Sequence, residues 1–202
     1  PRDTLIGSGL TNLDDLPRGA LVGTASLRRQ AQLLHRRPDI QITLLRGNIQ
    51  TRMRKIRDGE ADATFLALAG LKRMGIGHEA AYVLSPEEFL PACGQGAIGI
   101  TCRAKDSRVR SWLQRTNHAK TMIQISAERA MLDQLDGTCH TPIGGLAAFN
   151  EDGDLTLRGL VARPDGTALF RGKLIGASVD AHALGRELGA RLRRDASDDL
   201  FL

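Results

Sequence analysis

Cationic side chains gather in one stretch of the chain. Between residues 18 and 57 there are ten Lys and Arg residues against one acid, Asp39, whereas the whole chain has a net charge of only +5. Nine of the ten cations are Arg, whose planar guanidinium can pair with both oxygens of a carboxylate or a phosphate. This stretch therefore predicts a site for an anionic ligand.

Position within the expected helices divides these arginines into two groups. Arginines in the last turns of two helices, one ended by Pro38 and one spanning 49–57, complement the helix dipole and need no ligand. Arg28 and Arg29 fall in a first turn, where the same dipole repels them, and Arg46 falls at a strand-to-helix turn. These three are the expected anion-binding cations. On this reasoning, their removal leaves the fold as stable as before or slightly more stable.

Hydroxyl and backbone N–H groups accompany these arginines. Thr24 and Ser26 stand just before the first helix, and Arg52 lies one turn into the second, so all three can face a crevice at the carboxyl edges of two strands. The sequence has no G-x-x-x-x-G-K-[ST] loop, which disfavours a nucleoside triphosphate. No aromatic residue lies among the arginines, which disfavours single-stranded nucleic acid and leaves duplex backbone binding open.

Three cysteines offer possible nucleophiles or ligands. Cys93, Cys102 and Cys139 form no CxxC pair, and the histidines share no ligand spacing, so neither a disulfide framework nor a metal site is expected. Cys93 and Cys102 fit the role of small buried residues. Cys139 follows a helix stop and precedes His140, so it is either an accessible nucleophile or an unreactive loop thiol.

The elements that must position these residues follow from the apolar pattern. Residues 1–92 alternate strand-like and helical runs, which predicts an α/β domain with a parallel sheet. The expected elements are strands near 21–22, 40–44 and 63–68, with helices over about 27–37 and 49–57.

The second half has a different pattern. Residues 93–117 predict a glycine-rich strand over 96–102 and a short helix over 109–113, too little to form a domain. Residues 118–202 predict an α+β domain that contains a helix, a three-stranded antiparallel sheet and a final helix from about Asp180. The strands are separated by Glu151-Asp152-Gly153 and Pro164-Asp165-Gly166, which are strong turn signals.

Composition and chain start set further limits. The chain has 202 residues, of which 42% are hydrophobic and 25% charged, as in globular proteins. No run approaches the roughly 18 apolar residues of a membrane helix. Because the chain starts at Pro1 without Met or a signal-peptide pattern, we expect a fragment of a longer chain. The odd number of cysteines without a CxxC pair makes a reducing cytoplasm the expected compartment.

Several motifs in order along the chain resemble the hydroxymethylbilane synthase family, also called porphobilinogen deaminase. The matching segments are Gly-Thr-Ala-Ser-Leu-Arg-Arg-Gln at 23–30, Leu-Arg-Gly-Asn at 45–48 followed by Thr51-Arg52, Ala-Leu-Ala-Gly-Leu at 67–71, Leu-Pro-Ala-Cys-Gly-Gln-Gly-Ala at 90–97, and Cys139 with Pro-Ile-Gly at 142–144. The resemblance covers nearly the whole chain.

The resemblance implies a transferase of porphyrin, and hence haem, biosynthesis. The family joins four porphobilinogen molecules head to tail, with release of ammonia, into the linear tetrapyrrole hydroxymethylbilane. It implies a periplasmic-binding-protein-like α/β domain, which is the family's second domain, and a cofactor-attachment domain. It also implies a cytoplasmic monomer, with porphobilinogen as its small-molecule partner and with no metal, nucleic-acid or membrane partner.

The resemblance also implies roles for particular residues. A dipyrromethane cofactor would be attached covalently to Cys139. The residues around it would be Thr24, Ser26, Arg28, Arg29, Arg46, Gly47 and Arg52, and the substrate-binding residues would be Arg28, Arg46, Arg52 and Gln95.

The chain departs from the family pattern in one respect that bears on catalysis. The His-Ser-x-Lys-Asp motif with the family's catalytic aspartate does not occur, so the resemblance implies a fragment without most of the first domain, without a catalytic residue and inactive alone. Residues 93–117 would be the returning strand and helix of that first domain. The alternatives are a non-catalytic module that binds small polycarboxylates and a basic protein that binds an RNA backbone.

Overall fold

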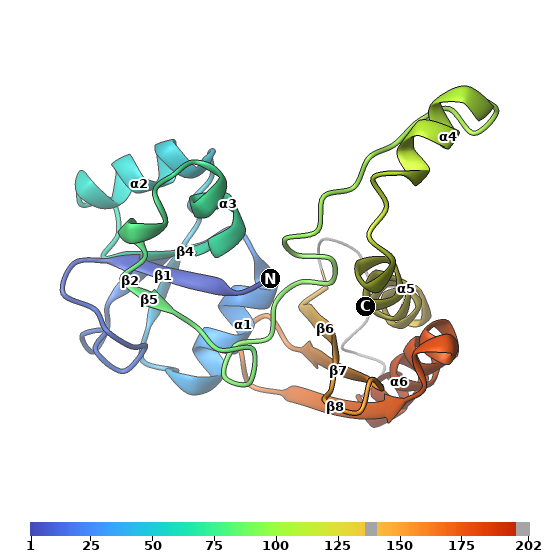
Figure 1. Cartoon of the computed structure of the whole chain (residues 1–202). Coiled ribbons are helices and arrows are strands. Elements are labelled where there is room, and N and C mark those ends of the chain that lie inside the picture. Colours follow the sequence, from blue (N-terminus) through green and yellow to red (C-terminus); the bar gives the residue numbers. More distant parts are fainter. Residues whose placement is uncertain (136–140, 197–202) are drawn as a thin grey trace.

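The computed structural model describes residues 1–135 and 141–196, which form a five-stranded sheet and a three-stranded sheet with helices packed on both (Figure 1). No helix among these residues is long and apolar enough to cross a membrane. The mixed α/β and α+β fold class expected from the sequence is confirmed.

The five-stranded sheet has the order β3-β2-β4-β1-β5. Its parallel part consists of β2 (Leu21–Gly23) between β3 (Gln41–Thr43) and β4 (Ala63–Ala67), as the alternating pattern predicted. Two antiparallel strands that the sequence did not predict complete the sheet. They are β1 (Asp3–Gly7), paired with β4, and β5 (Tyr82–Val83), paired with β1.

Helices pack against both faces of this sheet. They are α1 (Leu27–Arg36), α2 (Ile49–Arg57) and α3 (Leu68–Arg73), with a short 3₁₀ helix at Gly77–Glu79. Leu33 of α1 shares a buried cluster with Leu5 of β1, whereas Met53 of α2 shares another with the next residue of β1, Ile6. Because successive side chains of a strand point to opposite faces, α1 and α2 must cover opposite sides of the sheet.

The antiparallel sheet has the order β6-β7-β8, with strands Ile143–Phe149, Leu155–Ala162 and Leu169–Gly176. Helices α5 (Ala119–Gln134) and α6 (Ala181–Asp195) pack against each other and against this sheet, and a short 3₁₀ helix, Ser178–Asp180, precedes α6. The helix, three-stranded sheet and final helix expected from the sequence are therefore confirmed.

The two sheets are joined through α1, which also contacts β7 and β8. Ala31 of α1 and Leu90 share a buried cluster with Leu160 and Ala162 of β7. At the turn before β8, Gly166 has φ +75°, and a Cβ there would lie 2.5 Å from the backbone nitrogen of His35. A glycine is therefore needed where this turn meets α1.

The segment between the two sheets differs from the sequence prediction. Helix α4 (Ser107–Gln114) forms, and it projects away from both sheets (Figure 1). Residues 96–102 form no strand, so that prediction is wrong. Ile98 is 80% exposed, and no described strand pairs with this segment. A local alternating pattern makes a strand only where another strand supplies hydrogen-bond partners.

Candidate functional site

Arg28 and Arg29 lie in the first turn of α1, but they do not project into open solvent. Only 5% of Arg28 and 8% of Arg29 is exposed, and both contact Asp3 of β1, which is fully buried. Arg29 donates to Asp3 Oδ1 from Nε at 3.1 Å and from Nη2 at 2.7 Å. Arg28 Nη1 lies 2.8 Å from Asp3 Oδ2. One carboxylate thus serves two guanidinium groups.

Carbonyl and amide oxygens hold the same two arginines from other sides. Arg29 Nη1 donates to the carbonyl of Phe65 at 2.9 Å, and Arg28 Nη1 donates to the carbonyl of Leu90 at 2.6 Å. Gln95 links the pair to Asp3, because its Oε1 accepts from Arg28 Nη2 at 3.3 Å while its Nε2 donates to Asp3 Oδ1 at 3.1 Å. We call Asp3, Arg28, Arg29 and Gln95 the arginine cluster.

The charges in the arginine cluster stabilise one another. Burial alone would raise the pKa of Asp3, but the charges and hydrogen bonds of Arg29 and Arg28 outweigh burial and hold that pKa below its usual value. Burial lowers the pKa of Arg28, and the attraction of Asp3 opposes this shift. At neutral pH the cluster therefore contains a carboxylate between two guanidinium ions.

Asp3 overturns one expectation drawn from the sequence. Arg28 and Arg29 were expected to lack a partner in the chain and to tolerate removal, but both are buried and paired with Asp3. The carboxylate was missed because it lies on β1, a strand that the sequence pattern did not reveal, more than twenty residues before the arginines. The only signal for this strand in the sequence was the short apolar run Leu5-Ile6, which Asp3 precedes by two residues.

The two hydroxyl residues lie where the sequence placed them, before α1. Ser26 is the N-cap, and its Oγ accepts from the backbone N–H of Arg29 at 3.4 Å. Thr24 is buried, and its Oγ1 accepts from the backbone N–H of Ser26 at 3.1 Å. Both hydroxyls therefore stabilise the turn that carries the arginine pair.

The turn before α2 lies close to this turn. Arg46 and Gly47 are exposed there, and Arg52 Nε donates to the carbonyl of Gly47 at 2.8 Å. Burial lowers the pKa of Arg52, and the nearby charge of Arg29 lowers it further. Arg52 thus extends the field of positive charge beyond the arginine cluster.

The three cysteines have different environments. Cys139 lies outside the described residues. Burial, reinforced by the negative charge of Glu128, raises the pKa of Cys93 to about 12, so its thiol is protonated and unreactive at neutral pH. Cys102 is exposed rather than buried, because the strand expected to contain it does not form.

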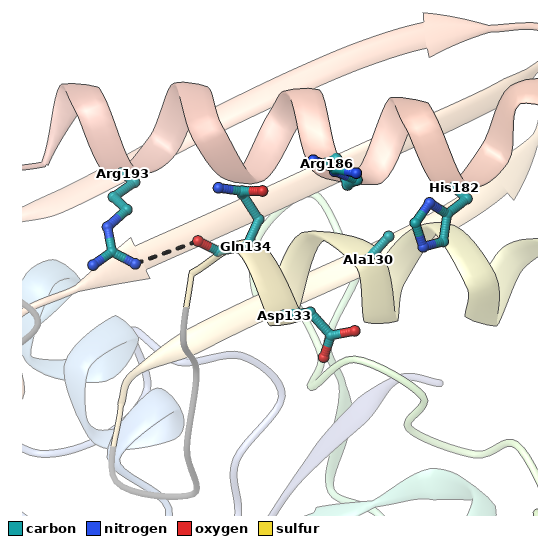
Figure 2. A pocket seen from close by; sticks show the side chains of 6 residues that line it. All are labelled: Ala130, Asp133, Gln134, His182, Arg186 and Arg193. Atoms are coloured by element: carbon teal, nitrogen blue, oxygen red, sulfur yellow. Dashed lines mark hydrogen bonds between the residues drawn. The ribbon is translucent and has the colours of Figure 1, made fainter.

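Two surface hollows occur elsewhere in the described part of the chain. One of about 300 Å³ lies between α5 and α6, where Arg193 Nη1 donates to the carbonyl of Gln134 at 3.4 Å (Figure 2). A second of about 340 Å³ lies beside β7 and β8. Neither contains a site residue expected from the sequence. Their linings are Ala130, Asp133, Gln134, His182, Arg186 and Arg193 for the first, and Pro86, Glu87, Leu90, Arg158, Gly159, Arg171, Gly172 and Lys173 for the second.

The chemistry of the arginine cluster suits a carboxylate ligand. Arg28 Nε is buried and has no hydrogen-bond partner among the described residues. Two guanidinium charges exceed the single charge of Asp3, and the N-terminus of α1 adds its partial positive charge. Among the described residues, no group of three or more His, Cys, Asp or Glu side chains could hold a metal ion.

The fold is that of an α/β sheet unit followed by an α+β unit, with the arginine cluster at the start of α1. A family model described as porphobilinogen deaminase, dipyromethane cofactor binding domain, matches residues 1–111, and one described as porphobilinogen deaminase, C-terminal domain, matches residues 122–194. The chain belongs to the porphobilinogen deaminase family.

Curated relatives agree with this family. Proteins named porphobilinogen deaminase from Nitrobacter hamburgensis and Nitrobacter winogradskyi are 47% and 48% identical to the chain over 200 residues. Each alignment covers 99% of this chain and 63% of the relative. The chain thus spans less than two thirds of the length of these relatives.

Proposed function

We propose that this chain, in its whole protein, is a hydroxymethylbilane synthase. Such an enzyme joins four porphobilinogen molecules head to tail, releasing ammonia, to give hydroxymethylbilane. The observation that carries the proposal is the buried arginine cluster at the start of α1, within the region that matches the cofactor-binding family model. Guanidinium groups suit the acetate and propionate side chains that each pyrrole ring bears.

The arginines would bind and orient these side chains. Arg28 and Arg29 are fixed within the fold, whereas Arg46 is exposed and Arg52 is partly exposed near them. We assign Arg28, Arg46 and Arg52 to the pyrrole carboxylates of the substrate, with Gln95 held beside Arg28. Fixed cations lower the entropic cost of ordering each ring before a bond forms.

The residues present also fit a dipyrromethane cofactor. The unpartnered Arg28 Nε is a buried donor suited to an acceptor on a ligand, and Thr24, Ser26, Arg29 and Gly47 surround the same two turns. When bound, the cofactor would supply the pyrrole carbon to which the first new ring is joined. We propose Cys139 as its attachment residue, and this residue lies outside the described part of the chain.

We assign no catalytic residue to the arginine cluster. Release of ammonia develops positive charge on the pyrrole, which a nearby carboxylate would stabilise. The carboxylate of the cluster, Asp3, is fully buried and already paired with two guanidinium groups. Its role is therefore to serve the arginines rather than the substrate.

The compartment, the oligomeric state and the boundaries of the structural units also belong to the proposal. We propose a cytoplasmic monomer, with an α/β unit over residues 1–92, a connecting segment over 93–117 and a cofactor-attachment unit over 118–202. Free Cys93 and Cys102 suit a reducing compartment. Sedimentation of the whole protein tests its monomeric state, and limited proteolysis tests the two limits.

Replacement of Cys139 tests the proposed function. In the whole protein, Cys139→Ser should abolish porphobilinogen consumption and remove the dipyrromethane mass from the purified protein. Cys93→Ala is the matched control, since the half-buried, protonated Cys93 thiol should not be needed for either. Full activity of Cys139→Ser, or loss of the cofactor mass from Cys93→Ala, would refute the assignment.

A further inference from the structure

We propose that Asp3 is a positioning residue for carboxylate binding. It would fix the two guanidinium groups of Arg28 and Arg29, and it would cancel one of their two charges so that the pair accepts one ligand carboxylate. The identity of that ligand as a pyrrole rests on the proposed function. The positioning itself rests on the geometry of the arginine cluster.

Asp3 contacts both arginines at once. Each oxygen of its carboxylate faces a different arginine, with Oδ1 toward Arg29 and Oδ2 toward Arg28. Each arginine is also held by a backbone carbonyl, that of Phe65 or of Leu90. A guanidinium held from two sides has lost its rotamer freedom before a ligand arrives, so binding need not supply that entropy.

Asp3 is itself fixed by the five-stranded sheet. It lies opposite Ala67 in the pairing of β1 with β4, and its carbonyl accepts from the backbone N–H of Leu84 at 3.0 Å. Strands on both sides thus hold its backbone in place. A displacement of this carboxylate would require a displacement of β1 within the five-stranded sheet.

The charges of the arginine cluster do not cancel. The pair carries two positive charges and Asp3 one negative charge, so one positive charge is left for a ligand. Both arginines are at least nine-tenths buried, and an uncompensated buried charge is costly. Without Asp3, the buried pair would require a second external anion. Asp3 therefore keeps the fold independent of anions while the site still attracts one.

The contacts within the arginine cluster determine which donors of the two arginines stay unpaired. Arg29 donates to Asp3 Oδ1 and to the carbonyl of Phe65, and Arg28 donates to the carbonyl of Leu90 and to Gln95. Arg28 Nε and Asp3 Oδ2 have no hydrogen-bond partner among the described residues, although Asp3 Oδ2 forms an ion pair with Arg28 Nη1. The internal contacts thus select which donors remain for a ligand. A carboxylate displaced by one methylene group would change that selection without changing the charge.

Two variants separate the charge of Asp3 from its geometry. Asp3→Asn keeps the size of the side chain and removes the charge, whereas Asp3→Glu keeps the charge and moves the carboxylate. Asp14→Asn is the matched control, because Asp14 also pairs with an arginine, Arg36, at 2.7 Å but is 61% exposed. A surface pair of this kind contributes little.

The charge role is tested by thermal unfolding of this chain with added sodium succinate. The reference is sodium chloride at equal ionic strength. Asp3→Asn should melt below wild type in dilute buffer, and succinate should raise its midpoint at least about twice as much as that of wild type, because a bound anion stabilises the folded state. Asp14→Asn should respond as wild type does. The charge role is overturned if succinate raises the melting midpoint of Asp3→Asn no more than that of wild type. It is also overturned if Asp3→Asn is unfolded in dilute buffer and succinate does not restore the folded state.

The positioning role is tested in the whole protein, by measuring from the intact mass the fraction that carries dipyrromethane. Asp3→Glu should respond to succinate as wild type does, yet the fraction of protein carrying dipyrromethane should fall about tenfold, since displaced arginines bind the cofactor less well. Wild-type loading in Asp3→Glu overturns the positioning role. If wild type itself carries no dipyrromethane, the proposed function fails, and the succinate arm still tests the charge role of Asp3 by itself.

Discussion

At the scale of single residues, the ion pairs of Asp3 with Arg28 and Arg29 contribute to the stability of the fold. A surface arginine is easily replaced because water solvates both members of its ion pair. Arg28 and Arg29 are different, because their removal would leave part of the charge of a fully buried carboxylate without a partner. The charges of Arg28 and Arg29 therefore contribute to folding.

Arg29→Leu should consequently destabilise the fold, in contrast to the expectation from helix position alone. We expect the free energy of unfolding of this chain to fall by about 3 kcal/mol, because Asp3 loses its hydrogen bonds from Nε and Nη2. Arg36→Leu, which breaks partly exposed pairs, should cost less than about 1 kcal/mol. Urea unfolding of both variants provides the comparison, and equal losses would show that burial of the Arg29 pair contributes nothing.

The low pKa of Asp3 predicts that its contribution to the free energy of unfolding depends on pH. Because its folded pKa lies below the ordinary 3.8, Asp3 adds stability above that pH and loses it as the pH falls toward the folded pKa. The difference in unfolding free energy between wild type and Asp3→Asn should be largest near pH 6 and shrink below about pH 4. Urea unfolding at pH 6, 4 and 3 in one low-salt buffer tests this, and a constant difference would contradict it.

At the scale of elements, local signals in the sequence predicted most of the fold. Helices α1 and α2 were predictable because capping side chains and apolar spacing occur within each segment. Strand β1 was not, because its partners β4 and β5 lie about sixty residues or more along the chain. The wrong strand over 96–102 has the same cause, since pairing depends on distant residues.

The turn between β7 and β8 offers a test of how elements join. Gly166→Ala should destabilise the chain by about 3 kcal/mol, since the new Cβ meets a positive φ and the backbone of α1 at His35. Gly153→Ala is the matched control, because Gly153 also has a positive φ but has open space where a Cβ would lie, so about 1 kcal/mol is expected. Thermal unfolding measures both, and equal shifts would mean that the contact of this turn with α1 adds no stability.

At the scale of the whole molecule, sequence motifs predicted which polar side chains lie together better than they predicted the charge between them. Arg28, Arg29 and Gln95 were each expected at one site from motifs far apart in the sequence, and the structure brings them together. The carboxylate between them could not be predicted, because nothing in the residues near Asp3 indicates that β1 passes beside α1. Local motifs thus predict where the cations lie, whereas the position of the carboxylate that neutralises them depends on how the strands of the sheet pair.

The last prediction concerns catalysis by the 202-residue chain alone. We expect it to consume no porphobilinogen, because loss of ammonia needs a carboxylate that can face the developing positive charge. In the arginine cluster the carboxylate is Asp3, which is fully buried and already paired with both arginines, so it cannot face a bound pyrrole. A consumption assay on chain verified by intact mass, with the whole protein as positive control, tests this. Turnover by the chain alone would show that Asp3 or another carboxylate within these residues can reach the substrate.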